Sequence, residues 1–321
     1  MPLRMPLRMN TRDTNALSAC TLCPRACGVD RKVKPGLCGM GATLRVALAQ
    51  LHYGEEPCLS GTSPEAGGSG TIFFSGCSLR CVYCQNHDIS MGRPEGVGLG
   101  HDLSVDDLTA LMLELQRSGA HNVNLVTPTH FTPLVRQALV LARANGLRVP
   151  VVWNSSAYET VDTLRTLEGL VDIYLPDLRY MDSQAAARYS AAPDYPEVAM
   201  AAIKEMHRQV GQLVVEVGPE GQLARRGLLI RLLALPGNAG RVDLALDWIA
   251  GNLGTGTAIS LMGQYYPAHR TREFPEIDRG LKPIEYAALR RHMERLGFEN
   301  GFVQQVGSSS SFTPDFRQND G

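Results

Sequence analysis

The sequence predicts an α/β fold in which a parallel sheet forms a partial (β/α)6 barrel of the TIM type. Two observations lead to this prediction. Short apolar runs alternate with helix-like segments six times between about residues 71 and 296, and most of these runs end in polar residues. Such alternation produces a parallel sheet covered by helices, and polar strand ends are typical of a barrel whose site lies at the carboxyl ends of its strands.

The six predicted strands are short and largely apolar, as expected for strands that are covered on both faces. They are TIFFSG, NVNLVTP, VPVVWNS, VDIYLPD, GLLIRLLALP and AISLMGQY, at residues 71–76, 122–128, 149–155, 171–177, 227–236 and 258–265. Apolar residues at spacings of three and four predict helices that begin near Ser104, Phe131, Tyr158, Pro196, Asp243 and Pro283. An additional hairpin is expected to turn at residues 218–221, before the fifth strand.

The composition gives no sign of a partner bound by charge or of a membrane span. The chain has 321 residues, with 31 Lys and Arg against 32 Asp and Glu, so no general field attracts nucleic acid or anionic lipid. No run reaches the roughly 18 apolar residues of a transmembrane helix. We therefore expect a cytoplasmic protein that binds neither nucleic acid nor membrane.

The cysteines are confined to the first quarter of the chain. Two tight groups of thiols in a long cytoplasmic chain indicate metal binding, and a disulfide framework is the alternative. We therefore expect a cysteine-rich metal-binding segment at residues 1–60, the barrel at residues 61–306 and a loose tail at residues 307–321.

The first cysteine group can close a metal site by itself. CTLCPRACGVDRKVKPGLCG holds Cys20, Cys23, Cys27 and Cys38 at C-x2-C-x3-C-x10-C spacing, which suits a tetrahedral zinc ion or an iron–sulfur cluster. The spacing does not separate these two metals. Cys58 stands alone further along the chain and is expected to be a buried small residue.

The second cysteine group, GCSLRCVYCQNHD, has one thiol fewer than a closed structural site needs. Cys77, Cys81 and Cys84 follow C-x3-C-x2-C spacing. From the residues alone, three interpretations stay open: zinc completed by His87, redox thiols, or an iron–sulfur cluster. A [4Fe-4S] cluster held by three cysteines leaves one iron free to bind a substrate or a cofactor.

CSLRCVYCQN resembles the C-x3-C-x-aromatic-C signature of the radical S-adenosylmethionine (SAM) superfamily, with Tyr83 as the aromatic residue. The resemblance covers about residues 70–300. It implies that Cys77, Cys81 and Cys84 hold a [4Fe-4S] cluster whose open iron is chelated by SAM. Reduction of the cluster by reduced flavodoxin or ferredoxin then cleaves SAM to a 5'-deoxyadenosyl radical, which takes a hydrogen atom from the substrate.

Within that superfamily, YCQNHDIS is similar to the glycyl radical enzyme activases, such as the pyruvate formate-lyase activating enzyme. The flanks resemble an activase-like branch through HYGEEP, GSGTIFFSGC, NLVTPTHF, VVWNSSAYE and YLPDLRY. One departure weakens the transfer of the activase substrate. Where the activases carry a Gly-Gly-Glu type motif after the second strand, this chain has Thr-Pro-Thr-His at residues 127–130.

The resemblance also suggests which residues contact SAM, and Tyr83 is one of them. Thr127 and Thr129 take the place of the motif that cradles the aminoacyl end of SAM. Asp177 and Arg179 match the activases' Asp-Leu-Lys, and their equal parity in the strand points both side chains to one face. Asn154 could reach the ribose or the substrate. The alternatives are an ordinary surface ion pair and polar residues that only mark strand ends.

The sequence therefore favours a radical SAM iron–sulfur enzyme that acts on a glycyl radical enzyme or on a small molecule. The competing function is a non-catalytic module in which both cysteine groups bind structural zinc. The missing fourth thiol of the second group counts against it. Near Cys58, the residues His52, Glu55 and Glu56 suit a polar site, although a solvated loop explains them equally well.

Overall fold

The computed structural model describes residues 16–63, 67–91, 99–218, 221–304 and 316, and it confirms the predicted partial barrel. The six predicted strands lie side by side in chain order, and each neighbouring pair is parallel. They are β2 (Gly68–Phe74), β4 (Ala120–Val126), β5 (Val151–Ser155), β6 (Ile173–Pro176), β8 (Gly221–Leu233) and β9 (Ala258–Met262).

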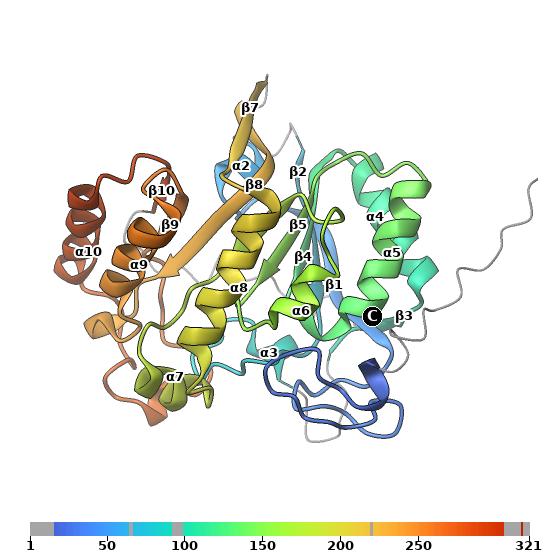
Figure 1. Ribbon diagram of the computed structural model, residues 1–321, viewed down its shortest axis with the longest axis horizontal. Coiled ribbons are helices and arrows are strands. Elements are labelled where there is room, and N and C mark those ends of the chain that lie inside the picture. Colours follow the sequence, from blue (N-terminus) through green and yellow to red (C-terminus); the bar gives the residue numbers. More distant parts are fainter. Residues whose placement is uncertain (1–15, 64–66, 92–98, 219–220, 305–315, 317–321) are drawn as a thin grey trace, which may run out of the picture.

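Six helices cover the outside of this sheet (Figure 1). Each begins within three residues of its predicted start: α4 (Val105–Arg117), α5 (Thr132–Ala144), α6 (Val161–Arg165), α8 (Tyr195–Val210), α9 (Val242–Leu253) and α10 (Pro283–Leu296). Local chemistry explains the starts. Ser104 and Asp107 form a capping box at α4, and α5, α8 and α10 carry proline in the first turn, where its missing N–H costs no hydrogen bond.

Further strands extend the sheet. β1 (Leu44–His52) pairs antiparallel with β2, and β3 (His101–Leu103) pairs with β1. β10 (Gly301–Val303) lies parallel to β9. β7 (Val214–Gly218) forms the predicted hairpin with β8, in which Gly218 pairs with Gly221.

Part of the predicted segment at residues 1–60 packs on the sheet, because this segment contains β1 and the short helix α2 (Pro57–Ser60). In the predicted tail at residues 307–321, Phe316 is described; it is buried and packs edge-on against Phe73, with 5.3 Å between ring centroids. The other residues of that tail lie outside the described residues.

The core lies between the sheet and its helices. Leu125, Trp153 and Ile230, from three strands of the sheet, expose none of their surface. Burial of a large apolar side chain stabilises a fold by roughly 1.5–3 kcal/mol relative to leaving it exposed. The strands therefore form a firm frame for the residues at their ends.

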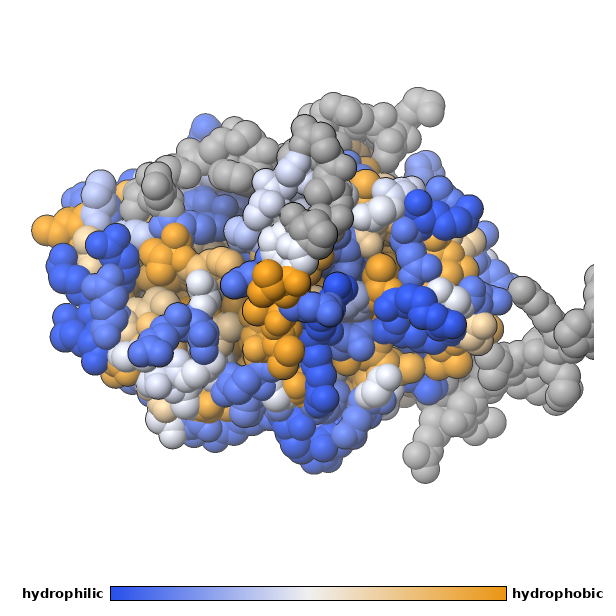
Figure 2. Space-filling model, turned by 90° about the horizontal axis from the view of Figure 1, so that it is seen from above, coloured by the Kyte–Doolittle hydropathy of each residue, from blue (hydrophilic) through white to orange (hydrophobic). Residues whose placement is uncertain are grey.

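The two ends of the barrel differ. The cysteine-rich segment (dark blue in Figure 1) and α3 (His87–Ser90) lie where the parallel strands finish, and α2 and the tip of the β7–β8 hairpin lie at the opposite end. A view onto the hairpin end shows apolar and hydrophilic residues interspersed (Figure 2). In the described part of the chain, no helix has the length and apolar character needed to cross a bilayer.

Candidate functional site

A cavity open to solvent is lined by the loop after β2 and by the carboxyl ends of β4, β5, β6, β8 and β9. Cys77, Cys81 and Cys84 line one part of it. Glu55, Glu56 and Arg231 also belong to the lining. The cavity therefore brings together sulfur ligands and charged groups from distant parts of the sequence.

The three cysteines lie on the loop between β2 and α3. Gly76 has a φ of +81°, in the left-handed region, and its N–H donates to the carbonyl oxygen of Ile89 at 2.7 Å. The Cys84 N–H donates to the carbonyl oxygen of Cys81 at 3.2 Å, which closes a tight turn. This turn returns the chain to the cavity, so that all three thiols line it.

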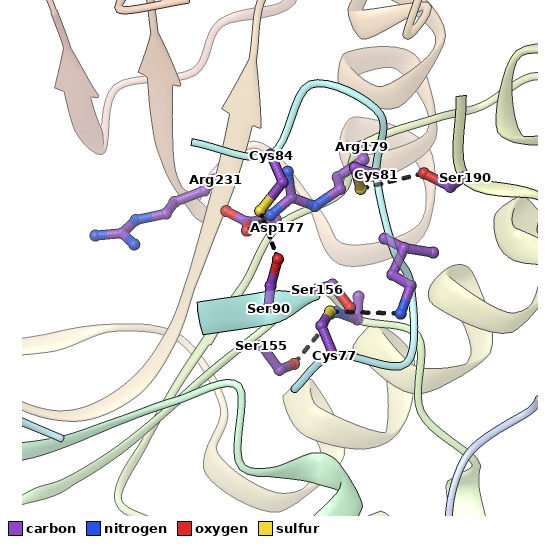
Figure 3. Close-up of polar contacts among 12 residues, drawn as sticks. Cys77, Cys81, Cys84, Ser90, Ser155, Ser156, Asp177, Arg179, Ser190 and Arg231 are labelled. Carbon is purple, nitrogen blue, oxygen red and sulfur yellow. Dashed lines mark hydrogen bonds and ion pairs between the residues drawn. The ribbon is translucent and has the colours of Figure 1, made fainter. Parts of the chain in front are cut away.

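Each of these thiols has a hydrogen-bond partner within 3.4 Å (Figure 3): the Leu79 N–H for Cys77, the Ser190 hydroxyl for Cys81 and the Ser90 hydroxyl for Cys84. Burial raises the pKa of Cys84 to about 12 and also raises that of Cys77. Uncompensated burial keeps a thiol protonated, whereas donors that point at sulfur favour its anionic or metal-bound form. The loop therefore suits thiols that become ligands once a cationic centre is present.

The donor set fits an iron–sulfur cluster better than a zinc ion completed by His87. The His87 ring places Nδ1 3.2 Å from the carbonyl oxygen of Cys84 and Nε2 3.7 Å from Asp88, and it stacks on His269. Among the described residues, no three Cys, His, Asp or Glu side chains converge closely enough for a single metal ion. A four-iron cluster occupies more space than one ion, so its ligands stand farther apart.

Five of the six residues predicted to contact SAM line the cavity: Tyr83, Thr127, Asn154, Asp177 and Arg179. The Arg179 Nη2 lies 2.6 Å from Asp177 Oδ2, in agreement with their expected common face. Their side chains are 23% and 20% exposed, so the pair is partly open. Burial acts against the charge of Arg179, but Asp177 raises its pKa above the ordinary value, so the guanidinium stays charged.

Thr129, the sixth of these residues, does not line the cavity. Its side chain is buried and donates to Glu159 Oε1 at 2.9 Å. Glu159 also accepts from Trp153 Nε1 at 2.8 Å and from Ser155 Oγ at 2.6 Å. The sequence predicted a SAM contact for Thr129. In the structure its hydroxyl instead donates to the buried Glu159, which connects the loop after β4 to β5.

The sequence interpretation missed Arg231. Its Nε donates to Glu56 Oε1 at 2.8 Å, and its Nη2 forms ion pairs with both Glu55 and Glu56. The two glutamates and the arginine are separated by about 175 residues in the chain. The parity of polar residues in β8 was the signal available, because Arg231 interrupts an otherwise apolar run.

The cysteine-rich segment packs directly against the loop that carries the second cysteine group. The Cys77 N–H donates to the carbonyl oxygen of Cys38 at 3.2 Å. The Arg25 guanidinium donates to four carbonyl oxygens, those of Ser78, Leu79, Ser190 and Ala191. Arg25 thus links the cysteine-rich segment both to the loop before Cys81 and to the chain at Ser190, whose hydroxyl contacts the Cys81 sulfur.

The four thiols of the first group lie near one another. A Cβ built on Gly36 would lie 3.4 Å from the Cys38 sulfur and 3.5 Å from the Cys27 sulfur. Burial raises the pKa of Cys23 to about 12, with a contribution from repulsion by Cys20, Cys27 and Cys38. As for the second group, no three of these thiols stand at the spacing of a single metal ion in the described chain. Cys58 lies apart, in an apolar cluster with Leu59 and other residues of the sheet, as expected for a small buried side chain.

Comparison with known proteins finds a match to one family over part of the chain. The sequence profile of the Radical SAM superfamily matches residues 71–217. An uncharacterised protein of Methanocaldococcus jannaschii is 29% identical over 272 residues, which make up 83% of this chain and 72% of that protein.

Among solved structures, HydG, a maturase of the [FeFe]-hydrogenase, has 13% identity and a TM-score of 0.45 over 74% of this chain. The chain spans 51% of the length of that HydG chain. Methylornithine synthase (PylB) has 12% identity and a TM-score of 0.46, with 76% of this chain and 74% of that chain covered.

Replacing Gly76 with Ala should destabilise the protein. A Cβ at this position would lie 2.4 Å from Met40 Cγ and 2.7 Å from the Cys38 carbonyl oxygen, on a backbone with positive φ. We expect the free energy of unfolding, measured by chemical denaturation, to fall by about 2–4 kcal/mol. Gly280→Ala is the matched control, because a Cβ at Gly280 meets no atom within 4 Å. Equal stability of the two variants would contradict the close approach of the two segments.

Proposed function

We propose that this protein is a radical SAM enzyme that abstracts a hydrogen atom from its substrate, and the match of residues 71–217 to a radical SAM domain supports this proposal. Such a domain implies a [4Fe-4S] cluster, SAM and a low-potential electron donor, for which we propose reduced flavodoxin or ferredoxin in the cytoplasm. One observation carries the proposal. In the described chain, three cysteines of a single loop line one cavity at the carboxyl ends of the strands.

Cys77, Cys81 and Cys84 would hold the cluster through their thiolates. With SAM bound, the reduced cluster would supply the electron that cleaves a C–S bond of SAM, giving methionine and the 5'-deoxyadenosyl radical that takes the hydrogen atom. The hydroxyls of Ser90 and Ser190 lie 3.2 and 3.1 Å from two of the sulfurs. Hydrogen bonds to cluster sulfurs help to set the reduction potential, so these two serines would tune the electron transfer.

The cavity walls would orient SAM and exclude water. The Nε of Arg179 is buried without a hydrogen-bond partner in the described chain, and a guanidinium suits a carboxylate. Asp177 would receive N–H or O–H groups of the ligand. The Thr127 N–H donates to the Asn154 carbonyl oxygen at 2.8 Å, so the ends of β4 and β5 form one wall. Tyr83 is buried against Tyr180 and Tyr265, which keeps this side dry.

Cys20, Cys23, Cys27 and Cys38 are proposed to bind a second metal centre, either zinc or an iron–sulfur cluster. The support is the mutual repulsion of the four neighbouring thiols and the number of ligands, which is enough to close such a site. This segment contacts the loop that carries Cys77, Cys81 and Cys84, so a metal centre in the segment would also stabilise that loop.

Two classes of substrate are proposed for this enzyme: a glycyl radical enzyme and a small polar molecule. The sequence CVYCQNHD supports a glycyl radical enzyme, presented to the cavity as an extended loop. The charged cavity lining supports a small polar molecule. Transfer of deuterium into 5'-deoxyadenosine from a labelled glycine of a co-expressed glycyl radical enzyme would favour the first class, and transfer from a labelled metabolite would exclude it.

Replacing Cys77, Cys81 or Cys84 with Ala should abolish reductive cleavage of SAM, because each variant removes a ligand of the catalytic cluster. The measurement is 5'-deoxyadenosine formed under dithionite by anaerobically reconstituted protein, together with a loss of about four irons per chain. Cys58→Ala is the matched control, since Cys58 lies in an apolar cluster outside the cavity lining. Formation of 5'-deoxyadenosine by the triple variant would refute the assignment.

Replacing Cys23 and Cys27 together with Ala should remove one metal centre and leave the SAM-cleaving cluster in place. We expect the free energy of unfolding to fall by several kcal/mol, because binding of a structural metal contributes directly to folding. Separate determination of zinc and iron per chain measures the loss and names the metal. An unchanged metal content would show that these thiols are not ligands.

A further inference from the structure

Glu55, Glu56 and Arg231 together form the part of the cavity that we call the cavity floor. Glu55 and Glu56 lie between β1 and α2, and α2 packs on β8, the strand that carries Arg231. The three side chains are between 4% and 13% exposed. Figure 3 shows Arg231 directed away from the three cysteines, so the floor and the thiols occupy different parts of the cavity.

Charge is not balanced at the cavity floor. Two carboxylates face one guanidinium, which leaves one negative charge uncompensated. Burial acts against the charge of Glu56, but Arg231 holds the pKa of Glu56 below the ordinary value, so this carboxylate stays ionised. The other ion pair of the lining, Asp177 with Arg179, adds no net charge.

Two buried amide oxygens, one beside Glu55 and one in the cavity lining, also lack donors in the described chain. Asn124 is fully buried and donates its Nδ2 to Glu55 at 2.9 Å, while its Oδ1 has no partner among the described residues. Gln304 belongs to the cavity lining, and its Oε1 is also buried without a partner among the described residues. An unpaired buried acceptor is unfavourable. Of these two oxygens, that of Gln304 belongs to the cavity lining, so an N–H donor of a ligand would satisfy it.

A purely structural role explains only half of this arrangement. One carboxylate paired with Arg231 would be enough to join the chain before α2 to β8. A second buried carboxylate adds desolvation cost without a second cation, and buried charges are expensive unless they are paired. The surplus carboxylate of the cavity floor therefore points to a missing cationic partner.

We infer that the cavity floor is a substrate subsite that binds a cationic N–H donor, such as the ammonium of a primary amine. Glu55 and Glu56 receive the cation, and Arg231 holds the two carboxylates in place. The rest of the substrate then extends from the floor toward the three cysteines. This inference rests on the proposed function, because it assigns a substrate class to the same cavity.

The test measures binding of three four-carbon probes, n-butylammonium, n-butanol and butyrate, to the full-length, anaerobically reconstituted protein by ligand-observed NMR. We expect saturable binding of n-butylammonium, at least about tenfold tighter than that of the other two probes. Glu55→Gln keeps the shape of the side chain but removes its charge, and should weaken n-butylammonium binding by about tenfold or more.

Glu216→Gln is the matched control, because Glu216 is an exposed carboxylate of β7 that pairs with Arg225 outside the cavity lining. This variant should bind n-butylammonium as the unchanged protein does. If Glu55→Gln does not fold, Glu55→Asp, which keeps the charge, should retain the preference for n-butylammonium over butyrate.

Three outcomes would overturn the inference: no saturable binding of n-butylammonium, equal or tighter binding of butyrate, or unchanged affinity in a folded Glu55→Gln variant. Probe binding requires no cleavage of SAM. A protein that cleaves SAM but does not prefer the ammonium refutes only the subsite, whereas one that binds the ammonium and forms no 5'-deoxyadenosine refutes only the proposed function.

Discussion

The close contact between Gly76 and the cysteine-rich segment is the constraint on which the site depends. Gly76 joins β2 to Cys77, and Met40 and Cys38 occupy the space that a side chain at this position would need. The approach also sets the hydrogen bond from the Cys77 N–H to the Cys38 carbonyl oxygen. Only a residue without Cβ fits at position 76. Gly76 therefore determines both the direction of the cysteine loop and the position at which the N-terminal segment packs against it.

Two arginines hold that segment against the barrel by binding carbonyl oxygens. Arg25 binds four of them around Cys81, and the buried Arg31 binds those of Met40, Gly41 and His130. Buried guanidinium groups are tolerated when their N–H donors are satisfied, and carbonyl dipoles do this without a carboxylate. The apolar cluster of the segment is small, so these contacts and the proposed metal centre would provide much of its stability.

The repeating part of the fold could be predicted because its signals are local. Apolar runs and capping residues such as Ser104 mark the six strand–helix units within a few residues of where they occur. Strand β1 was missed, although its alternating Leu44, Val46 and Leu48 carry a strand pattern, because the neighbouring cysteines dominated the interpretation of residues 1–60.

The site was predicted less completely, because sequence parity gives the face of a residue but not its partner. Asp177 and Arg179 lie on a common face as parity requires, whereas Thr129 lies in a short 3-10 helix, where neither strand nor helix periodicity tells which way a side chain points. Its partner Glu159 is 30 residues away in the chain. The pairing of Arg231 with Glu55 and Glu56 is still more distant in sequence, and no local pattern connects them.

The surplus negative charge of the cavity floor bears on which substrates the cavity can accept. A neutral internal loop of a polypeptide carries no cation, so it would leave this charge uncompensated. A small cationic molecule, or the amino terminus of a chain, would supply the cation that the two glutamates and Arg231 lack. Since unpaired buried charges cost more than unpaired neutral groups, the floor favours a substrate that carries its own cation over one that passes as a neutral loop.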